Sequence, residues 1–369
     1  MGVVMVRGWW VVFLLVGTLF AIDVYAVSCK KNAFLSAPEE GAQSQQKELP
    51  AGYNASASFV GRNETGVFFT ADYIYWDWTQ GSMKLGDFVD PSTKPKKQVA
   101  VLLSPGYASG VQVGAGYRMA NVDGWNLNFQ YTFYQNSASQ GEETTNDQYV
   151  RYIDPVKQKL KVFQGSMQYH LNMKYNELWG MLQRPFYFGK RLLANFGVGL
   201  DSLWVVQQLS SDFNGLSGNN PSNATTLTVG SSTTETKEWS LGPRASLDAS
   251  WQLGQGIAFL ADIAGSLLYT RYYDLDYLMK LDKASGKTKL FSASLPQNVN
   301  TLTPILQFFL GLNWSRNLAR NGYRLGLTAG YDFAAYWNFD MLNFHSIIHN
   351  TESANMYLHG LRLESRFDF

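Results

Sequence analysis

Apolar and polar residues alternate through most of this chain. Between Trp125 and Phe133 every odd position is aromatic or leucine, and every even position is Asn, Gln or Thr. Such period-2 alternation predicts a β-strand with two chemically different faces. The pattern returns at least nine times along the sequence, so we predict an all-β protein.

The connections between these segments alternate in length. Those at 78–110, 136–158, 208–238, 274–301 and 338–355 are long and polar, those at 120–124, 254–256 and 316–322 are short, and 176–191 is intermediate. This alternation is typical of a transmembrane antiparallel up-and-down β-barrel with long outer loops and short periplasmic turns. A sheet in hydrocarbon must close because no water satisfies its edges. We count ten strands, and twelve if 53–62 and 147–153 also form strands.

Large aromatic residues occupy positions of the apolar face near the ends of the predicted strands. Amphipathic rings favour the two membrane interfaces, so these residues predict two girdles around the barrel. The predicted girdle residues are Trp125, Tyr175, Trp204, Trp239, Trp251, Trp314, Tyr323, Trp337 and Tyr357.

Residues on the opposite, polar parity should point into the barrel. An open lumen lined by them would bias ions weakly, because both signs of charge are represented about equally. In a narrow ten-stranded barrel the same side chains could instead pair across the interior and fill it. The predicted lumen residues are Arg118, Gln130, Gln164, Gln168, His170, Asp201, Arg244, Asp248, Asp262, Arg324, Asp332, Arg362, Glu364 and Arg366.

The first 26 residues have the features of a secretory signal peptide. Arg7 precedes an apolar run from Trp9 to Phe20, and small or compact residues lead up to Ala26. We therefore expect 1–26 to be a signal peptide, 27–65 an N-terminal periplasmic segment that could contribute to the first strand, and 66–369 the barrel. Cys29 follows a weak lipoprotein-like cleavage site and is a candidate for lipidation.

Composition and charge narrow the function classes. Only 16% of residues are charged, against about a quarter in soluble proteins. A net charge of +1 without clustered Lys or Arg argues against nucleic-acid binding, and a single Cys excludes a disulfide scaffold. Beyond the first 26 residues no apolar run is long enough for a membrane helix.

Enzymatic chemistry has little support in the sequence. There is no Gly-x-Ser-x-Gly nucleophile motif. His345 and His349 lie four residues apart but have no nearby acidic ligand, so we interpret them as ordinary loop residues rather than a metal site. We expect no enzymatic activity, no metal and no cofactor.

The chain ends in an alternating strand whose apolar positions include Phe367 and Phe369. A terminal aromatic residue of this kind is a signal for the barrel-assembly machinery. The chain resembles the pore-forming major outer membrane protein-like barrels of Legionella and chlamydia-related bacteria. The resembling segments are 71–76, 114–118, 123–133, 184–186, 242–246 and 359–369. The resemblance implies an outer-membrane pore or surface antigen and no catalytic residues.

We therefore expect an exported, multi-pass protein of a Gram-negative outer membrane, acting as a weakly selective pore for ions and small hydrophilic solutes. The alternative is a non-conducting adhesin or structural barrel that acts through its outer loops. Expected partners are membrane lipid, lipopolysaccharide, the barrel-assembly machinery and small solutes or ions, but no nucleic acid. Lys94, Lys96 and Lys97 form a small basic group that could meet lipopolysaccharide, although a solvated loop explains them more simply. The sequence does not decide whether the protein forms an oligomer.

Overall fold

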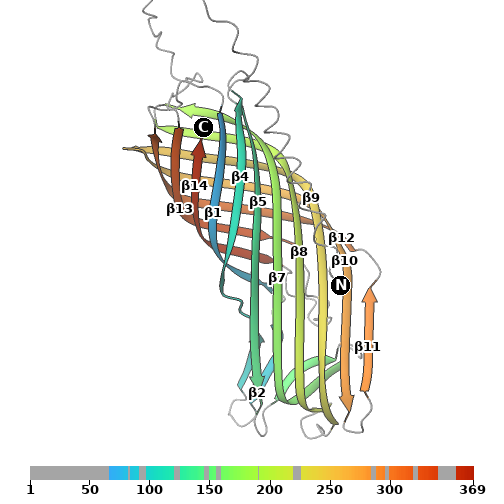
Figure 1. The fold of residues 1–369 in the computed structure, drawn as a ribbon. Coiled ribbons are helices and arrows are strands. Elements are labelled where there is room, and N and C mark those ends of the chain that lie inside the picture. Colours follow the sequence, from blue (N-terminus) through green and yellow to red (C-terminus); the bar gives the residue numbers. More distant parts are fainter. Residues whose placement is uncertain are drawn as a thin grey trace, which may run out of the picture. The chain divides into compact units, whose positions relative to one another are not determined.

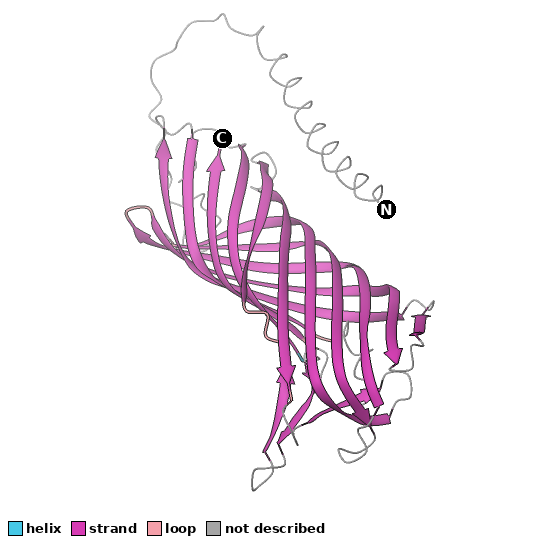
Figure 2. Cartoon of the chain, turned by 60° about the horizontal axis from the view of Figure 1, so that its bottom comes forward, coloured by secondary structure: helices cyan, strands magenta, loops and turns pink. Residues whose placement is uncertain are grey.

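The computed structural model describes residues 66–81, 84–90, 97–119, 125–144, 149–154, 159–189, 191–218, 226–283, 288–295, 299–318, 323–339 and 355–369. The predicted signal peptide, the predicted periplasmic segment, Cys29, His345 and His349 lie outside these ranges. Nearly all of the described chain is β-strand (Figure 2). The strands are β1(Gly66–Gln80), β2(Lys84–Asp90), β3(Lys97–Leu102), β4(Tyr107–Met119), β5(Trp125–Glu143), β6(Tyr149–Asp154), β7(Lys159–Phe188), β8(Leu192–Gly218), β9(Thr226–Gly254), β10(Ile257–Lys283), β11(Thr288–Leu295), β12(Val299–Leu318), β13(Tyr323–Tyr336) and β14(Met356–Asp368).

Ten of these strands form a closed antiparallel ring (Figure 1). The order around the ring is β1-β4-β5-β7-β8-β9-β10-β12-β13-β14, with β14 paired back to β1. The predicted all-β antiparallel barrel of ten strands is confirmed. The twelve-strand alternative is wrong for 147–153, because β6 pairs with β2 and β7 outside the ring; 53–62 lies outside the described residues.

β1 and β14 join the two ends of the barrel sequence. They share thirteen consecutive residue pairs, from Phe68 with Asp368 to Gln80 with Met356. The Ser365 hydroxyl also donates to the carbonyl of Ala71 at 3.0 Å. This pairing removes the last open edges of the ring, as a sheet in hydrocarbon requires.

Several segments expected as outer loops are strand. β7, β8, β9 and β10 are 30, 27, 29 and 27 residues long, whereas about 9–11 residues cross a bilayer. β8, β9 and β10, with β11 and the start of β12, therefore take up much of the loops predicted at 208–238 and 274–301, and β5 and β6 take up much of the loop predicted at 136–158. The predicted intermediate loop at 176–191 is wrong as well, because β7 continues to Phe188 and β8 begins at Leu192.

An apolar band covers the outer face of the ring near the short turns. On β12, for example, Leu302, Phe308, Leu310 and Leu312 are exposed, by 39–56%. A large exposed apolar surface around a closed barrel is the surface that lipid covers.

All but one of the predicted girdle residues have side chains on the outward face of the barrel. Trp251, Trp314, Tyr323 and Trp337 are exposed, and Trp125, Trp204, Trp239 and Tyr357 are half-buried. Tyr175 was predicted wrongly. It is fully buried inside the barrel, because it lies in the middle of β7 rather than at a strand end.

The interior changes character along the barrel. Near the short turns it is polar, whereas in the long-strand half aromatic and aliphatic side chains pack together beside a buried, hydrogen-bonded row that includes Ser240, Thr270 and Thr303. We call the most enclosed of the aromatic and aliphatic side chains the apolar plug. Its members are at most 1% exposed, and they are Trp78, Tyr134, Tyr175, Leu203, Leu268, Tyr336 and Phe339.

This reversal overturns three predicted lumen residues. Gln168 and His170 are exposed and Gln164 is half-buried, all on the outward face of β7. Met167, Tyr169 and other apolar neighbours turn inward instead. The rule that the apolar face points outward holds only where lipid surrounds the barrel; beyond the apolar band, water takes the polar face and the apolar face packs inside.

Two inter-strand contacts require glycine. A Cβ on Gly199 would lie 2.0 Å from the carbonyl oxygen of Gly180, and a Cβ on Gly242 would lie 2.0 Å from that of Leu267. Only a residue without a side chain allows the strands to approach so closely.

Candidate functional site

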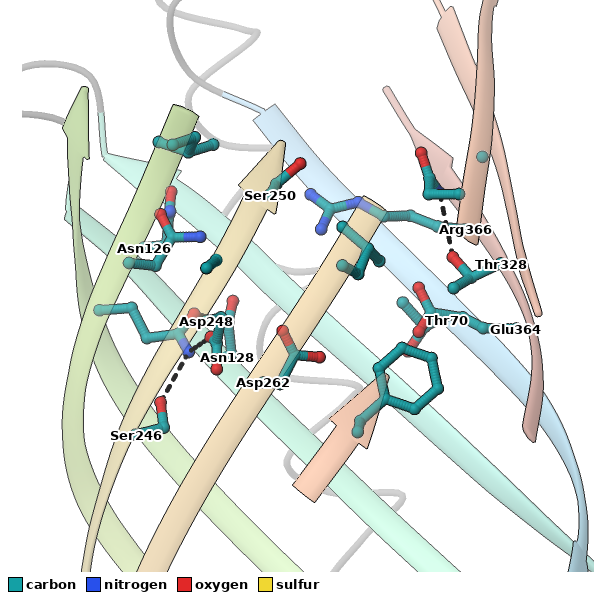
Figure 3. A pocket seen from close by; sticks show the side chains of 18 of the residues that line it. Thr70, Asn126, Asn128, Ser246, Asp248, Ser250, Asp262, Thr328, Glu364 and Arg366 are labelled. Carbon is teal, nitrogen blue, oxygen red and sulfur yellow. Dashed lines mark hydrogen bonds between the residues drawn. The ribbon is translucent and has the colours of Figure 1, made fainter. Parts of the chain in front are cut away.

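The membrane-spanning half of the barrel encloses a cavity of about 1530 Å³. Residues of the short turns, including Gly254, Gln255 and Gly256, line its near end. Its far end is lined by Trp76, Glu177 and Gln307 among others, and the apolar plug packs beyond them. Figure 3 shows polar side chains from several strands converging on this space.

The structure places ten of the fourteen predicted lumen residues in the cavity wall. They are Arg118, Gln130, Arg244, Asp248, Asp262, Arg324, Asp332, Arg362, Glu364 and Arg366. Asp201 is also on the inner face but is fully buried behind Arg244. Gln164, Gln168 and His170 are the three described above as outward-facing.

Arg244 organises the far end of the cavity. Its Nη1 atom lies 2.9 Å from Asp201 Oδ2 and 3.6 Å from Glu177 Oε1, and all three side chains are at most 6% exposed. Its Nη2 atom donates to Gln307, whose amide in turn donates to Glu177 at 2.9 Å. The guanidinium also lies 5.2 Å from the centre of the Trp179 ring. One arginine thus forms ion pairs with two carboxylates in an enclosed space, where an unpaired charge would be strongly destabilising.

Two tyrosines of the apolar plug close this network on its inner side. The hydroxyls of Tyr175 and Tyr336 are 2.6 Å apart, and the Tyr175 hydroxyl also donates to Glu177 at 2.9 Å. Both rings are at most 1% exposed. The polar cavity therefore ends at a closely packed layer within the described part of the chain.

A second arginine lies on the opposite wall. Arg362 contacts Asp332 at 3.4 Å and Asp262 at 3.7 Å. Its guanidinium lies 3.6 Å from the centre of the Phe309 ring, a distance typical of cation–π contact. Arg362 therefore bridges β10 and β13 across the strand between them.

Arginines dominate the short-turn end. Arg366 makes a bidentate contact with Asp368 and lies over the Phe68 ring at 3.7 Å. Arg118 lies 3.9 Å from the same carboxylate, and Arg324 donates to Ser315 at 2.8 Å. The basic residues lining this end outnumber the acidic ones, so the charges that looked balanced along the sequence are separated along the barrel.

Sequence reasoning missed several acidic residues of the interior, among them Asp72 and Glu177. Asp72 lies on the same side of β1 as the apolar residues Ile74 and Trp76, so this side was not identified as inward-facing. Glu177 lay inside a segment that was predicted to be a loop. Both are buried. Asp72 could have been found from its place in the alternation, since it stands between the outward residues Ala71 and Tyr73.

Neither metal sites nor membrane helices occur in the described ranges. No group of three or more His, Cys, Asp or Glu side chains there could hold a metal ion, and no helix there is long and apolar enough to cross a membrane. His359 accepts or donates a 2.8 Å hydrogen bond with the Tyr331 hydroxyl on the outer face. The candidate assembly residues Phe367 and Phe369 contact each other and Tyr323.

Comparison with known structures finds barrels of low similarity. A major outer membrane protein from Thermus thermophilus is 9% identical, with 83% of this chain and 100% of that chain covered and a TM-score of 0.28. The outer membrane protease OmpT from Escherichia coli is 7% identical, with 85% and 99% covered and a TM-score of 0.37. The Pseudomonas putida toluene transporter TodX is 9% identical, with 83% and 90% covered and a TM-score of 0.20. None of these likenesses bears on the activity of this chain.

The family comparison is informative. No curated protein matches the chain, but a family model described as Legionella pneumophila major outer membrane protein precursor matches residues 60–369. The match covers the whole described barrel, and it confirms the predicted family resemblance. The chain therefore belongs to the Legionella major outer membrane protein family and is an outer-membrane β-barrel protein.

Proposed function

We propose that this protein is a non-catalytic surface barrel whose lumen is closed at rest and whose long-strand end is its working surface outside the cell. The apolar plug is the observation that carries this proposal. A route for hydrophilic solutes needs open space through the whole barrel, whereas Trp78, Tyr175, Tyr336 and their neighbours fill the interior with almost no exposure. Desolvating an ion at such a layer is very unfavourable.

The long-strand end suits a role in recognition. Its outward faces carry hydroxyl, amide and imidazole side chains, with hydrogen-bonded pairs such as the Ser139 hydroxyl with His170 Nδ1 at 2.7 Å. β7 to β10 extend this surface well past the apolar band, and an interior packed like a soluble core keeps it rigid. A rigid polar platform is a suitable base for loops that contact a partner.

A second function, a pore for ions and small hydrophilic solutes, is favoured by the cavity itself. A space of about 1530 Å³ with charged walls reaches from the short turns to the middle of the barrel. If the plug moved, this space would be the inner half of a solute path, and Arg118 and Asp248 would bias its ion preference.

Planar-bilayer conductance of the folded barrel separates the two functions. We expect no discrete steps from the wild-type protein, and steps from a variant with Tyr175→Ala and Tyr336→Ala, which removes the layer at the end of the cavity. Tyr73→Ala, on the exposed outer face, is the matched control and should stay silent. Conductance steps from the wild-type protein would contradict the closed barrel. If the ion preference of those steps also changed in Arg118→Ala or Asp248→Ala, the pore function would be supported instead.

A further inference from the structure

Three basic side chains lie just beyond the apolar band on the outer face of the barrel. Lys174 on β7, Lys237 on β9 and Arg271 on β10 each lie four residues further from the short turns than an exposed leucine of the band. Those leucines are Leu178, Leu241 and Leu267, which are 40%, 41% and 47% exposed. Lys174 and Arg271 are themselves exposed, and the Lys237 side chain is 33% exposed. We call the three basic residues the basic sector.

The sheet register brings the basic sector together on neighbouring strands. β7, β8, β9 and β10 lie side by side in the ring (Figure 1). Val206 of β8 pairs with both Lys174 and Lys237, so two strand spacings, about 10 Å, separate the two lysines. Tyr273 pairs with Lys237 and lies two residues from Arg271, which makes Lys237 and Arg271 diagonal neighbours about 7–8 Å apart. Lysine and arginine side chains are long enough to reach one bound group across these distances.

Aromatic rings separate the basic sector from the leucines. Trp204 and Trp239 are direct cross-strand partners, and Trp239 also pairs with Arg271. Both tryptophans are half-buried on the outward face, and Tyr269, two residues before Arg271, is 48% exposed. Tryptophan and tyrosine favour the level of the lipid headgroups. The order of leucine, aromatic ring and basic residue therefore places the basic sector at the headgroups, where long cationic side chains are most favourable.

Five other strands of the ring have no basic residue at the corresponding position. Four residues outward from an exposed band residue, the strands β1, β4, β5, β13 and β14 lead in turn to Asp77, Tyr107, Ser137, Trp337 and Tyr357, with Trp337 directly after the last residue of β13. A general attraction to an anionic membrane surface would favour basic residues all around the barrel. Their restriction to β7, β9 and β10 indicates a local site instead.

The chain offsets the charge of the basic sector only in part. Glu235 Oε1 lies 3.1 Å from Lys237 Nζ. Within the described ranges, neither Lys174 nor Arg271 has an ion-pair partner. Lipid covers the surface directly beside these two residues, so the nearest anionic groups that can pair with them are those of lipid headgroups.

From these observations we propose that the basic sector binds the phosphorylated headgroup of a lipopolysaccharide molecule in the outer leaflet. Lys174 and Arg271 donate to the phosphate oxygens, because ammonium and guanidinium groups form strong charge-assisted hydrogen bonds with phosphate. Acyl chains of the same molecule lie against Leu178 and Leu241, below the two tryptophans. A lipid-borne phosphate suits this surface better than a free one, since the charges stand at the edge of the apolar band. The inference rests on the orientation in the proposed function, with the long strands outside the cell, but not on the closed lumen.

Native mass spectrometry of the full folded barrel, released from neutral detergent, tests the proposal with diphosphorylated lipid A as the probe. We expect saturable binding of this lipid, and binding at least about tenfold weaker for its dephosphorylated form. The double variant Lys174→Gln with Arg271→Gln should weaken binding about thirtyfold, because each Lys or Arg beside an anionic lipid surface contributes about fivefold. Lys174→Arg with Arg271→Lys keeps both charges and should stay within about threefold of wild type. Arg191→Gln with Arg316→Gln removes two exposed charges near the short turns, and this matched control should have no effect.

Three results would overturn the proposal. Equal binding of dephosphorylated lipid A would mean that phosphate plays no part, and equal weakening by the two double Gln variants would mean that the basic sector is not the site. Equal binding of phosphatidylglycerol, or displacement of lipid A by an equimolar amount of inorganic phosphate, would leave a general anion site in place of a lipopolysaccharide site. Heat-modifiable migration on gels verifies that each variant is folded, and Lys237→Gln replaces the double Gln variant if that variant does not fold. Conductance by the wild-type barrel would refute the closed lumen and leave this binding result unaffected.

Discussion

Removing the guanidinium of Arg244 should destabilise the barrel strongly. Arg244→Met keeps most of the side-chain volume but leaves Asp201 and Glu177 without their positive partner in a region that is at most 6% exposed. Removing one partner of a buried ion pair typically costs about 3–5 kcal/mol. Two carboxylates lose their partner here, so we expect about 4–5 kcal/mol, which lowers the folding equilibrium constant by about a thousandfold or more.

Denaturant unfolding in lipid vesicles, followed by tryptophan fluorescence, measures this loss. Lys174→Met is the matched control, because Lys174 is exposed on the outer face of β7 and its loss should change stability by no more than about 0.5 kcal/mol. Adding Asp201→Asn to Arg244→Met should restore part of the stability, since it removes one orphaned charge. If Arg244→Met and Lys174→Met were equally stable, the buried network would not be the organising element described above.

Two further predictions test the lipid boundary and the close strand contacts. Leu310→Arg puts a charge in the apolar band, where Leu310 is 56% exposed, and should lower the free energy of unfolding in vesicles by about 2–4 kcal/mol. Gln168→Arg, on the polar outer face, should lower it by less than about 0.5 kcal/mol. Equal losses of stability would mean that lipid surrounds both residues. Gly199→Ala brings a Cβ to 2.0 Å from the Gly180 carbonyl and should cost about 1–3 kcal/mol. Gly141→Ala, whose Cβ would have no neighbour closer than 3.9 Å, should be near neutral, and equal midpoints for the two variants would refute the steric reasoning.

The sequence predicts the membrane half of the fold well, because lipid outside and water inside impose one rule on every strand. The alternation around Trp125 and Phe133 and the short turn at 254–256 both follow from that rule. It fails on β7, where the apolar parity changes sides near Glu177 while the backbone continues. From the sequence alone, that change of parity indicates the end of a strand. For this reason Tyr175 was predicted at a strand end and His170 was predicted inside the barrel.

Part of the candidate site could likewise be predicted from the sequence, and part could not. Parity is enough to place Arg244 or Asp248 on the inner face, since it depends only on neighbours in the sequence. The separation of arginines from carboxylates along the barrel depends on how each strand is staggered against the next. That register joins Asp248 to Asp262 and Asp72 to Glu364, and no local pattern encodes it. The plug was equally hidden, because Tyr175 and Tyr336, 161 positions apart in the sequence, come together only in the closed ring.

Closure through β1 and β14 sets the timing of barrel formation. The hydrogen bond from Ser365 to Ala71 joins positions 294 apart, and contacts so distant in the sequence form slowly. Until they form, β1 and β14 are open edges on which another chain can pair. The period of greatest aggregation hazard therefore lasts until a single late event ends it. A factor that covers the edge of β1 during this interval would protect the nascent sheet without adding anything to the stability of the finished barrel.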